Sequence, residues 1–196
     1  MPPFCGGKHD DFGALMRIAL VRQPNIVLEL GTAYGNTVSN ICRQCPQVHV
    51  YTVNAPPEDI SGKLQTYALT REEIGSIYKR YGFSERVTQI YSDTLDMDLS
   101  RYFSGPVIDL AIIDACHDPN YVVNDFLKVM PYVRTQGLVL LHDTHPRMLA
   151  HLWGSYIGCM ELRRRGYDIR HITSTWWGVW QKPQEAVPPR AQGGAF

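Results

Sequence analysis

The chain has 196 residues, enough for one α/β domain with a sizeable core and short for two. Lysine plus arginine equals aspartate plus glutamate at 19 each, so no net positive field exists to hold a nucleic acid, and we expect no such partner. The N-terminus lacks a basic region followed by an apolar run, and no stretch has the roughly 18 apolar residues of a membrane span. We therefore expect a cytoplasmic protein without a membrane partner.

The five cysteines are odd in number and irregular in spacing, which favours reduced thiols over a disulfide framework and agrees with the cytoplasm. Cys42 and Cys45 have the spacing of redox and zinc motifs. They end a predicted helix before Pro46, however, and no second pair completes a zinc site. We assign them no metal or redox role.

Strand-length apolar runs alternate with helix-length amphipathic segments, which predicts a doubly wound α/β fold with a mostly parallel seven-stranded sheet. The predicted helices are Phe12–Val21, the segment from the turn at Gly35 to about Arg43, Glu72–Tyr81, Leu95–Tyr102, Tyr121–Val133 and Leu149–Arg165. The predicted strands are Ile26–Leu30, His49–Val53, Val87–Tyr91, Ile108–Ile113, Leu138–Leu141, Asp168–Ile172 and Trp177–Gln181. The last two strands are expected to form an antiparallel hairpin. Residues 1–183 are expected to form one domain, and residues 184–196, which lack an apolar period, a flexible tail.

The segment Ile26–Thr37 is the most informative, because an apolar strand ending near Glu29 runs into a turn that contains Gly31 and Gly35. Glycines let backbone amides approach a ligand, and open α/β sheets bind ligands beyond the carboxyl ends of their strands. A plain strand-to-helix turn is the alternative explanation.

This segment resembles the first motif of class I S-adenosylmethionine-dependent methyltransferases, a Rossmann-like family. The resemblance implies that Glu29 orients the turn and helps to hold the methionine ammonium, and that Gly31 lies beneath the cofactor. The implied cofactor contacts at this turn are Glu29, Gly31, Thr32, Tyr34 and Gly35. A nicotinamide enzyme is disfavoured, because G-x-G-x-x-G is absent here and Glu29 would repel a diphosphate.

The next two strands follow the same family pattern with one departure. The family has an acidic residue at the end of the second strand that binds the ribose hydroxyls, and this chain has Asn54. Asparagine loses the charge-assisted bidentate contact, so we expect weaker cofactor binding. Asp93 matches the position that meets the adenine amine, and it is equally compatible with a cap for the predicted helix Leu95–Tyr102.

Acidic and histidine side chains end the two central strands, with Asp114 and His117 after one and His142 and Asp143 after the next. Parallel strands open onto one crevice, so these four side chains are expected to converge near the transferable methyl group. The pattern resembles the metal-dependent O-methyltransferases that act on sugars, macrolides and other small natural products.

The resemblance implies catalytic roles for His117, as general base, and for Asp114, which also adjoins the cofactor. It implies a divalent metal, Mg or Mn, on Asp114, His142 and Asp143. His142 departs from the family, which commonly has a carboxylate there, and an imidazole suits manganese, iron or zinc better than magnesium. A helix cap at Asp114 and an interior role for His142 are the alternatives.

Aromatic residues have two explanations, an apolar acceptor pocket or the core; they are Tyr34, Trp153, Tyr156, Trp176, Trp177 and Trp180. The helical spacing of Leu149, Leu152, Trp153 and Tyr156 favours a packed face. Residues Asn54–Leu69 have no clear period and are expected to form a lid.

The leading hypothesis is methyl transfer from S-adenosylmethionine to a hydroxyl of a small molecule, such as a secondary metabolite. The second is a cofactor-binding relative with another role, a cyclase, an isomerase or a regulatory protein, motivated by Asn54 and His142. The short chain has no obvious extra lid domain, so a homo-oligomer that completes the site is also considered.

Overall fold

The computed structural model describes residues 10–58, 69–147 and 153–184. Its helices are α1 (Asp11–Arg22), α2 (Asn36–Gln44), α3 (Ser76–Arg80), α4 (Pro119–Val129) and α5 (Trp153–Arg164). Its strands are β1 (Ile26–Leu30), β2 (His49–Asn54), β3 (Val87–Tyr91), β4 (Ile108–Ile113), β5 (Val133–Leu141), β6 (Arg170–His171) and β7 (Gly178–Gln181). Within these residues, no helix is long and apolar enough to cross a membrane.

The strands form one seven-stranded sheet in the order β3-β2-β1-β4-β5-β7-β6. Strands β1 to β5 pair in parallel, whereas β7 pairs antiparallel with both β5 and β6. The predicted fold class is therefore confirmed, including the C-terminal antiparallel hairpin. Because β1 pairs with β2 on one side and β4 on the other, the strand order reverses at the carboxyl ends of β1 and β4. Open α/β sheets bind their ligands at such a point.

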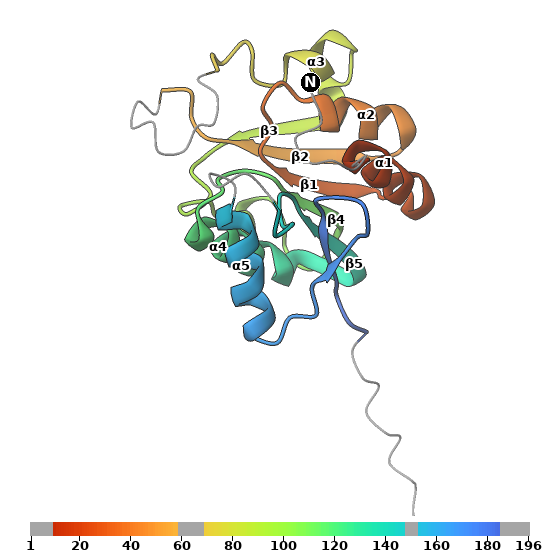
Figure 1. The fold of residues 1–196 in the computed structure, drawn as a ribbon. Helices are drawn as coiled ribbons and strands as arrows, with labels where there is room; N and C mark the ends of the chain where they lie inside the picture. The colour runs from red at the N-terminus through yellow and green to blue at the C-terminus, as the bar shows by residue number, and fades with distance from the viewer. Residues whose placement is uncertain (1–9, 59–68, 148–152, 185–196) are drawn as a thin grey trace, which may run out of the picture.

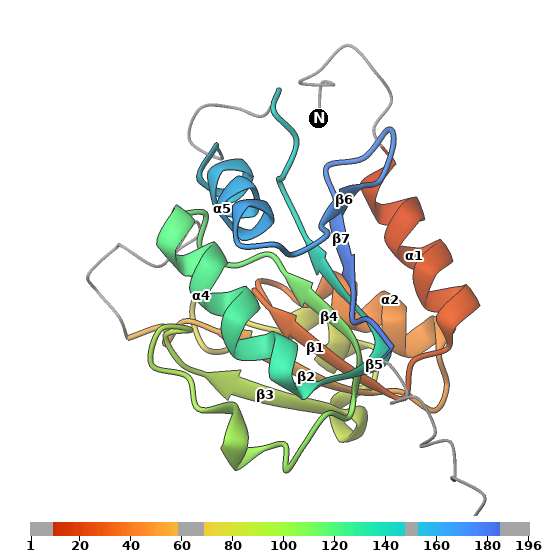
Figure 2. The same cartoon turned by 90° about the horizontal axis from the view of Figure 1, so that it is seen from below.

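Helices cover both faces of the sheet, with α1, α2 and α3 on one face and α4 and α5 on the other (Figures 1 and 2). Side chains alternate between the faces along each strand. Ile113 of β4 belongs to the apolar cluster around α4 and α5, and Ile112 to the cluster around α1 and α2. All residues of β4 are buried, which explains why its sequence is apolar except for Asp109, whose Oδ2 accepts the backbone amides of Asn25 and Ile26.

The predicted helix Leu95–Tyr102 is wrong, since the segment contains only a turn and a 3-10 helix, Leu99–Arg101. The reason is tertiary. The Lys128 ammonium on α4 donates to the carbonyl oxygens of Thr94, Leu95 and Met97, which takes up acceptors that an α-helix would use internally.

Other boundaries moved for local reasons. Helix α3 begins at Ser76 and not at Glu72, because Gly75 has a left-handed backbone with φ of 70°. Strand β5 begins at Val133, the residue at which the preceding helix was expected to end; α4 ends earlier, at Val129. The predicted start of α5 at Leu149, the proposed tail beyond residue 184 and most of the proposed lid lie outside the described residues.

Cys42 and Cys45 are free thiols on the buried side of α2. Burial raises the pKa of Cys42 to about 11 despite the nearby Arg86 guanidinium. The Cys42 thiol is therefore protonated at neutral pH.

Candidate active site

At the turn between β1 and α2, the backbone of Gly31 lies close to the backbones of Val53 and Asp114. Gly31 and Thr32 donate their amides to the carbonyl oxygen of Val53 at 2.8 and 3.1 Å. Gly31 has φ of 108°, and a Cβ there would lie 2.0 Å from the carbonyl oxygen of Asp114. Any side chain at this position would both strain the turn and displace the end of β4, so glycine is required for the two central strand ends to meet.

Glu29 lies beneath this turn, where only 3% of its surface is exposed. The Thr52 hydroxyl donates to Oε2 of Glu29 at 2.6 Å, and the Thr52 and Thr32 hydroxyl oxygens lie 2.7 Å apart. Burial raises the pKa of Glu29 to about 8, although the Thr52 hydrogen bond opposes the shift. This geometry suits the predicted role in orienting the turn, and the predicted contact with the methionine ammonium stays a prediction.

A second layer of polar contacts supports the turn from α3 and β3. The Gln89 amide donates to Oγ1 of Thr32 at 2.9 Å, and the Tyr78 hydroxyl donates to Oε1 of Gln89 at 3.2 Å. The Tyr78 ring also packs against Gly35, where a Cβ would lie 2.7 Å from Cδ1 of Tyr78. Sequence reasoning missed Tyr78 and Gln89. The one sequence feature that could have indicated the packing of Tyr78 is Gly75, where a Cβ would lie 2.2 Å from the Tyr78 ring.

The strand-end residues Asn54 and Asp93 are engaged within the protein. Oδ1 of Asn54 accepts the Ala33 amide at 3.1 Å, so this side chain holds the turn. Oδ1 of Asp93 accepts the Leu95 amide at 2.9 Å, and Oδ2 accepts the Tyr121 hydroxyl at 3.1 Å. Asp93 therefore caps a turn and not the predicted helix. The ribose and adenine roles of these two residues stay predictions, as does the role of Tyr34, which is largely exposed on the turn.

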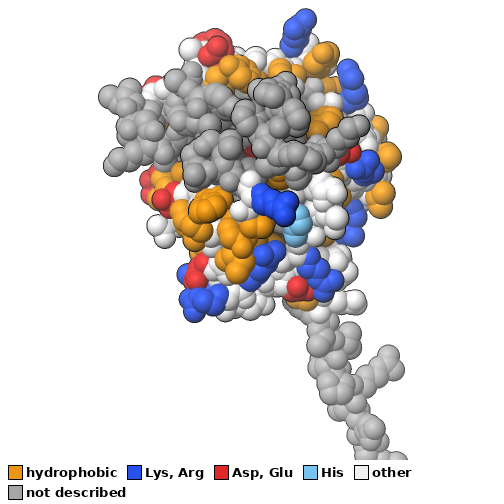
Figure 3. Space-filling model, viewed as in Figure 1, with side chains coloured by type: hydrophobic (Ala, Val, Ile, Leu, Met, Phe, Trp, Pro, Cys, Tyr) orange, Lys and Arg blue, Asp and Glu red, His pale blue; other side chains and the backbone are white. Residues whose placement is uncertain are grey.

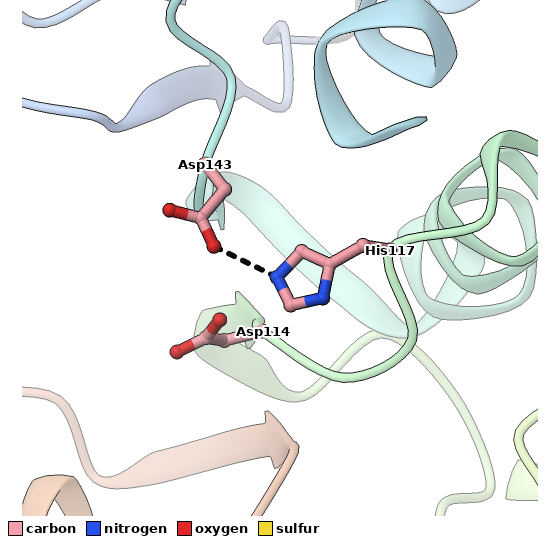
Figure 4. A group of neighbouring side chains, drawn as sticks. All are labelled: Asp114, His117 and Asp143. Carbon is pink, nitrogen blue, oxygen red and sulfur yellow. Dashed lines mark hydrogen bonds and ion pairs between the residues drawn. The ribbon is translucent and has the colours of Figure 1, made fainter. Parts of the chain in front are cut away.

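Three of the predicted acceptor-site residues meet where β4 and β5 end (Figure 4). Nε2 of His117 lies 2.7 Å from Oδ2 of Asp143, and a ligand-type atom from each of Asp114, His117 and Asp143 lies within 4.8 Å of the others. Asp114 is exposed, His117 is partly exposed and Asp143 is buried. Asp143 has φ of 55°, a left-handed conformation that aspartate tolerates better than most residues.

The fourth residue, His142, lies between carboxylates. Its Nδ1 is 3.3 Å from both Oδ1 of Asp114 and Oδ1 of Asp143, and its Nε2 is 3.8 Å from Oδ2 of Asp11. Burial disfavours the charged ring, yet the Asp114 charge and the other two carboxylates raise the pKa of His142 well above its usual value. Burial likewise opposes ionisation of Asp143, but the hydrogen bond from His117 and the His142 charge hold the Asp143 pKa well below its usual range. The edge is a network of histidine–carboxylate pairs.

Asp11, the first residue of α1, is a member of this network that sequence reasoning missed. Its Oδ1 accepts the Trp176 amide at 2.6 Å, and its backbone carbonyl accepts the Trp177 indole N–H at 3.0 Å. The His142 ring lies against Trp177, with ring centroids 4.2 Å apart. Asp11 thus joins α1 and the β6–β7 turn to the site, and no local sequence signal marks that role.

The donor set fits a divalent cation. Oδ1 of Asp143 is buried, and its one contact within the described residues is the ion pair with Nδ1 of His142 at 3.3 Å; two carboxylates with an imidazole surround a common point. This combination suits manganese, iron or zinc better than magnesium. The geometric set of Asp114, His117 and Asp143 contains His117, whereas the predicted set contained His142; Asp114 and Asp143 belong to both.

The aromatic residues divide between core and surface. Trp177 and Trp180 are buried in the core. The expected packed face through Trp153 is wrong for that residue, which is 49% exposed; α5 instead buries Ser155, Gly158, Cys159 and Leu162. The small side chains of that face allow α5 to lie close to α4. Apolar side chains remain on the outer surface around α5 (Figure 3), and Trp153 is one of the exposed apolar residues of this helix. Leu149 and Leu152 lie outside the described residues.

Comparison with known proteins agrees with this fold. A family model described as a methyltransferase domain matches residues 28–144, from β1 to the end of β5. Cofactor-bound Rv0187 from MTB aligns with a TM-score of 0.62 and 21% identity, over 85% of this chain and 75% of that one.

Two further structures have a similar fold. A putative caffeoyl-CoA O-methyltransferase from Staphylococcus aureus has a TM-score of 0.63 and 16% identity, over 88% of this chain and 82% of that one. The O-methyltransferase TomG from Streptomyces achromogenes, in complex with SAM, has a TM-score of 0.59 and 17% identity, over 86% and 78%. The family match covers more than half of the chain, from the glycine turn to the Asp143 loop. The chain therefore belongs to the methyltransferase domain family.

Proposed function

We propose that this protein transfers the methyl group of S-adenosylmethionine to a hydroxyl oxygen of a small molecule. The observation that carries the proposal is the contact between Gly31 and the carbonyl of Asp114. It brings the turn that resembles a cofactor motif directly beside the loop that holds His117. A donor on the turn would therefore present its methyl group to the histidine–carboxylate network.

The methyl donor is already electrophilic, so the protein must align the acceptor oxygen and remove its proton. In the tautomer that donates Nε2–H to Asp143, the basic atom of His117 is Nδ1, and Asp143 fixes the ring and stabilises its protonated form. The acceptor proton passes to Nδ1 as the oxygen–carbon bond forms and the carbon–sulfur bond breaks. S-adenosylhomocysteine and the methyl ether are the products.

A divalent cation would be held by Asp114, Asp143 and His142, which leaves both ring nitrogens of His117 for the Asp143 hydrogen bond and the proton transfer. Bound there, it would lower the pKa of the acceptor hydroxyl. Acceptors are expected to be hydroxyl-bearing small molecules, secondary metabolites among them, because the network ends at the exposed carboxylate of Asp114, which such a molecule can reach.

A second candidate is a relative that binds the cofactor without methylating. Two observations favour it: the Asn54 side chain is already bonded to Ala33 and Ala55, and a charged His142 lies between the two carboxylates. In this case His142 would supply the positive charge that a metal supplies elsewhere.

Turnover with labelled S-adenosylmethionine and a panel of phenols, sugars and carboxylic acids separates the two candidates. We expect a product methylated at a hydroxyl group. The rate of methylation should fall at least about a hundredfold in His117→Gln, while the affinity for S-adenosylhomocysteine stays within about threefold of wild type. The matched control is His49→Gln, at the start of β2 and bonded to Thr88. Full activity of His117→Gln would exclude the proposed base, and cofactor binding without any methylated product would favour the second candidate.

A further inference from the structure

The segment Asp114–His117 lies between two glycines from distant parts of the chain. A Cβ at Gly31 would lie 2.0 Å from the carbonyl oxygen of Asp114, and a Cβ at Gly154 would lie 1.8 Å from the carbonyl oxygen of His117. Real Cβ atoms do not approach backbone atoms so closely. The two ends of the segment are therefore each in contact with a backbone that tolerates no side chain.

Gly154 belongs to the first turn of α5, and its φ is not in the left-handed region that favours glycine. In a helix, alanine is more favourable than glycine by about 1 kcal/mol, so helix formation does not explain the residue. Space explains it, because the same Cβ would also lie 3.0 Å from Cδ of Pro119. The first turn of α5 thus lies directly on the backbone that follows His117.

On its other side, His117 is held through its ring, by the 2.7 Å contact with buried Asp143. The backbone of His117 is therefore held by α5, and Nε2 of its ring is held by Asp143 in the loop that follows β5. A shift of the backbone by the distance that a methyl group at position 154 requires, more than an ångström, would break a hydrogen bond of this length.

We propose that Gly154 is a positioning residue for His117: its lack of a side chain lets α5 hold the His117 backbone at the distance that places the ring against Asp143. The catalytic part of this inference rests on the proposed function. The geometric part does not.

Gly154→Ala tests the inference, with Gly158→Ala as the matched control. Gly158 lies one turn further along the same helix, and its Cβ would lie 2.9 Å from Cβ of Val122 and 3.1 Å from the carbonyl oxygen of Pro119, with no atom of His117 among its three nearest neighbours. Both variants disturb the packing of α5 on α4. Only Gly154→Ala is expected to move His117.

The first readout needs no activity. In protein with ¹⁵N-labelled histidine, we expect the His117 ring N–H resonance to shift or disappear in Gly154→Ala and to stay unchanged in Gly158→Ala. An unchanged resonance in Gly154→Ala, or equal changes in both variants, overturns the inference. If wild type fails to bind S-adenosylhomocysteine, the proposed function fails while this readout still decides the positioning role.

The second readout is kinetic. Gly154→Ala should lower kcat at least tenfold with little change in the KM for S-adenosylmethionine, and it should add no further loss in a His117→Gln background, because coupled residues are not additive. Additive losses contradict the inference. If Gly154→Ala does not fold, urea titration of wild type decides: the His117 ring signal should vanish at the same concentration that releases the amides of α5 to exchange. A ring signal that outlasts α5 overturns the inference.

Discussion

The two halves of the carboxyl edge of the sheet stabilise buried polar groups in different ways. At the β1–α2 turn, Glu29 is held by hydroxyl groups, and its pKa of about 8 keeps it largely protonated at neutral pH. At the ends of β4 and β5, buried Asp143 is ionised and paired with two imidazoles. Buried polar groups need partners, and buried charges need opposite charges. A cationic methyl donor bound between the two halves would therefore contact a largely uncharged Glu29 at the β1–α2 turn. An acceptor would contact the charged histidine–carboxylate network at the ends of β4 and β5.

The largest effect on stability should come from disturbing the contact between the β1–α2 turn and the end of β4. Gly31→Ala places a Cβ on the Asp114 carbonyl and strains a backbone at φ of 108°, so we expect a loss of about 4 kcal/mol in unfolding free energy, or failure to fold. Gly166→Ala is the control, since Gly166 also has positive φ, 96°, but nothing lies within 4 Å of its Cβ position. It should cost about 1 kcal/mol in urea unfolding. Equal losses would show that strain alone, and not the contact with β4, determines the role of Gly31.

Removing the negative charge of Asp143, at the ends of β4 and β5, should have the next largest effect. Asp143→Asn keeps the left-handed backbone accessible but leaves His117 and His142 without their buried anion, and we expect a loss of about 3 kcal/mol. The exposed pair of Asp168 and Arg170 supplies the control, because solvent screens this pair and Asp168→Asn should leave stability nearly unchanged. S-adenosylhomocysteine affinity should be nearly unchanged, and a large loss of it would mean that the two halves are not separate.

Glu29 at the β1–α2 turn predicts a pH dependence of stability. The folded-state pKa of Glu29, about 8, exceeds the ordinary value of 4.5, so folding takes up a proton, and stability falls as pH rises from about 5 to 8. Glu29→Gln cannot ionise. It should match wild type near pH 5 and exceed it by about 3 kcal/mol near pH 8, while S-adenosylmethionine affinity falls. The exposed Glu72→Gln should follow wild type, and parallel pH profiles for Glu29→Gln and wild type would contradict the burial argument.

Much of the fold follows from the sequence, because strands such as Ile108–Ile113 are defined by their own apolar pattern. The convergence of Asp114, His117, His142 and Asp143 also follows, since parallel strands end at one edge. Pairing does not follow: which imidazole meets which carboxylate depends on loop backbones such as the left-handed Asp143. The contacts of Asp11 and Lys128 depend on helices packed from elsewhere in the chain, and no local pattern records them.

Calorimetry with S-adenosylmethionine and S-adenosylhomocysteine on the wild-type protein tests the central claim most directly. The account predicts binding at micromolar concentration, with proton release on binding of the cationic donor that disappears in Glu29→Gln, because a positive charge above the turn favours the ionised carboxylate. An absence of heat with both ligands would contradict the assignment of the β1–α2 turn as the cofactor site.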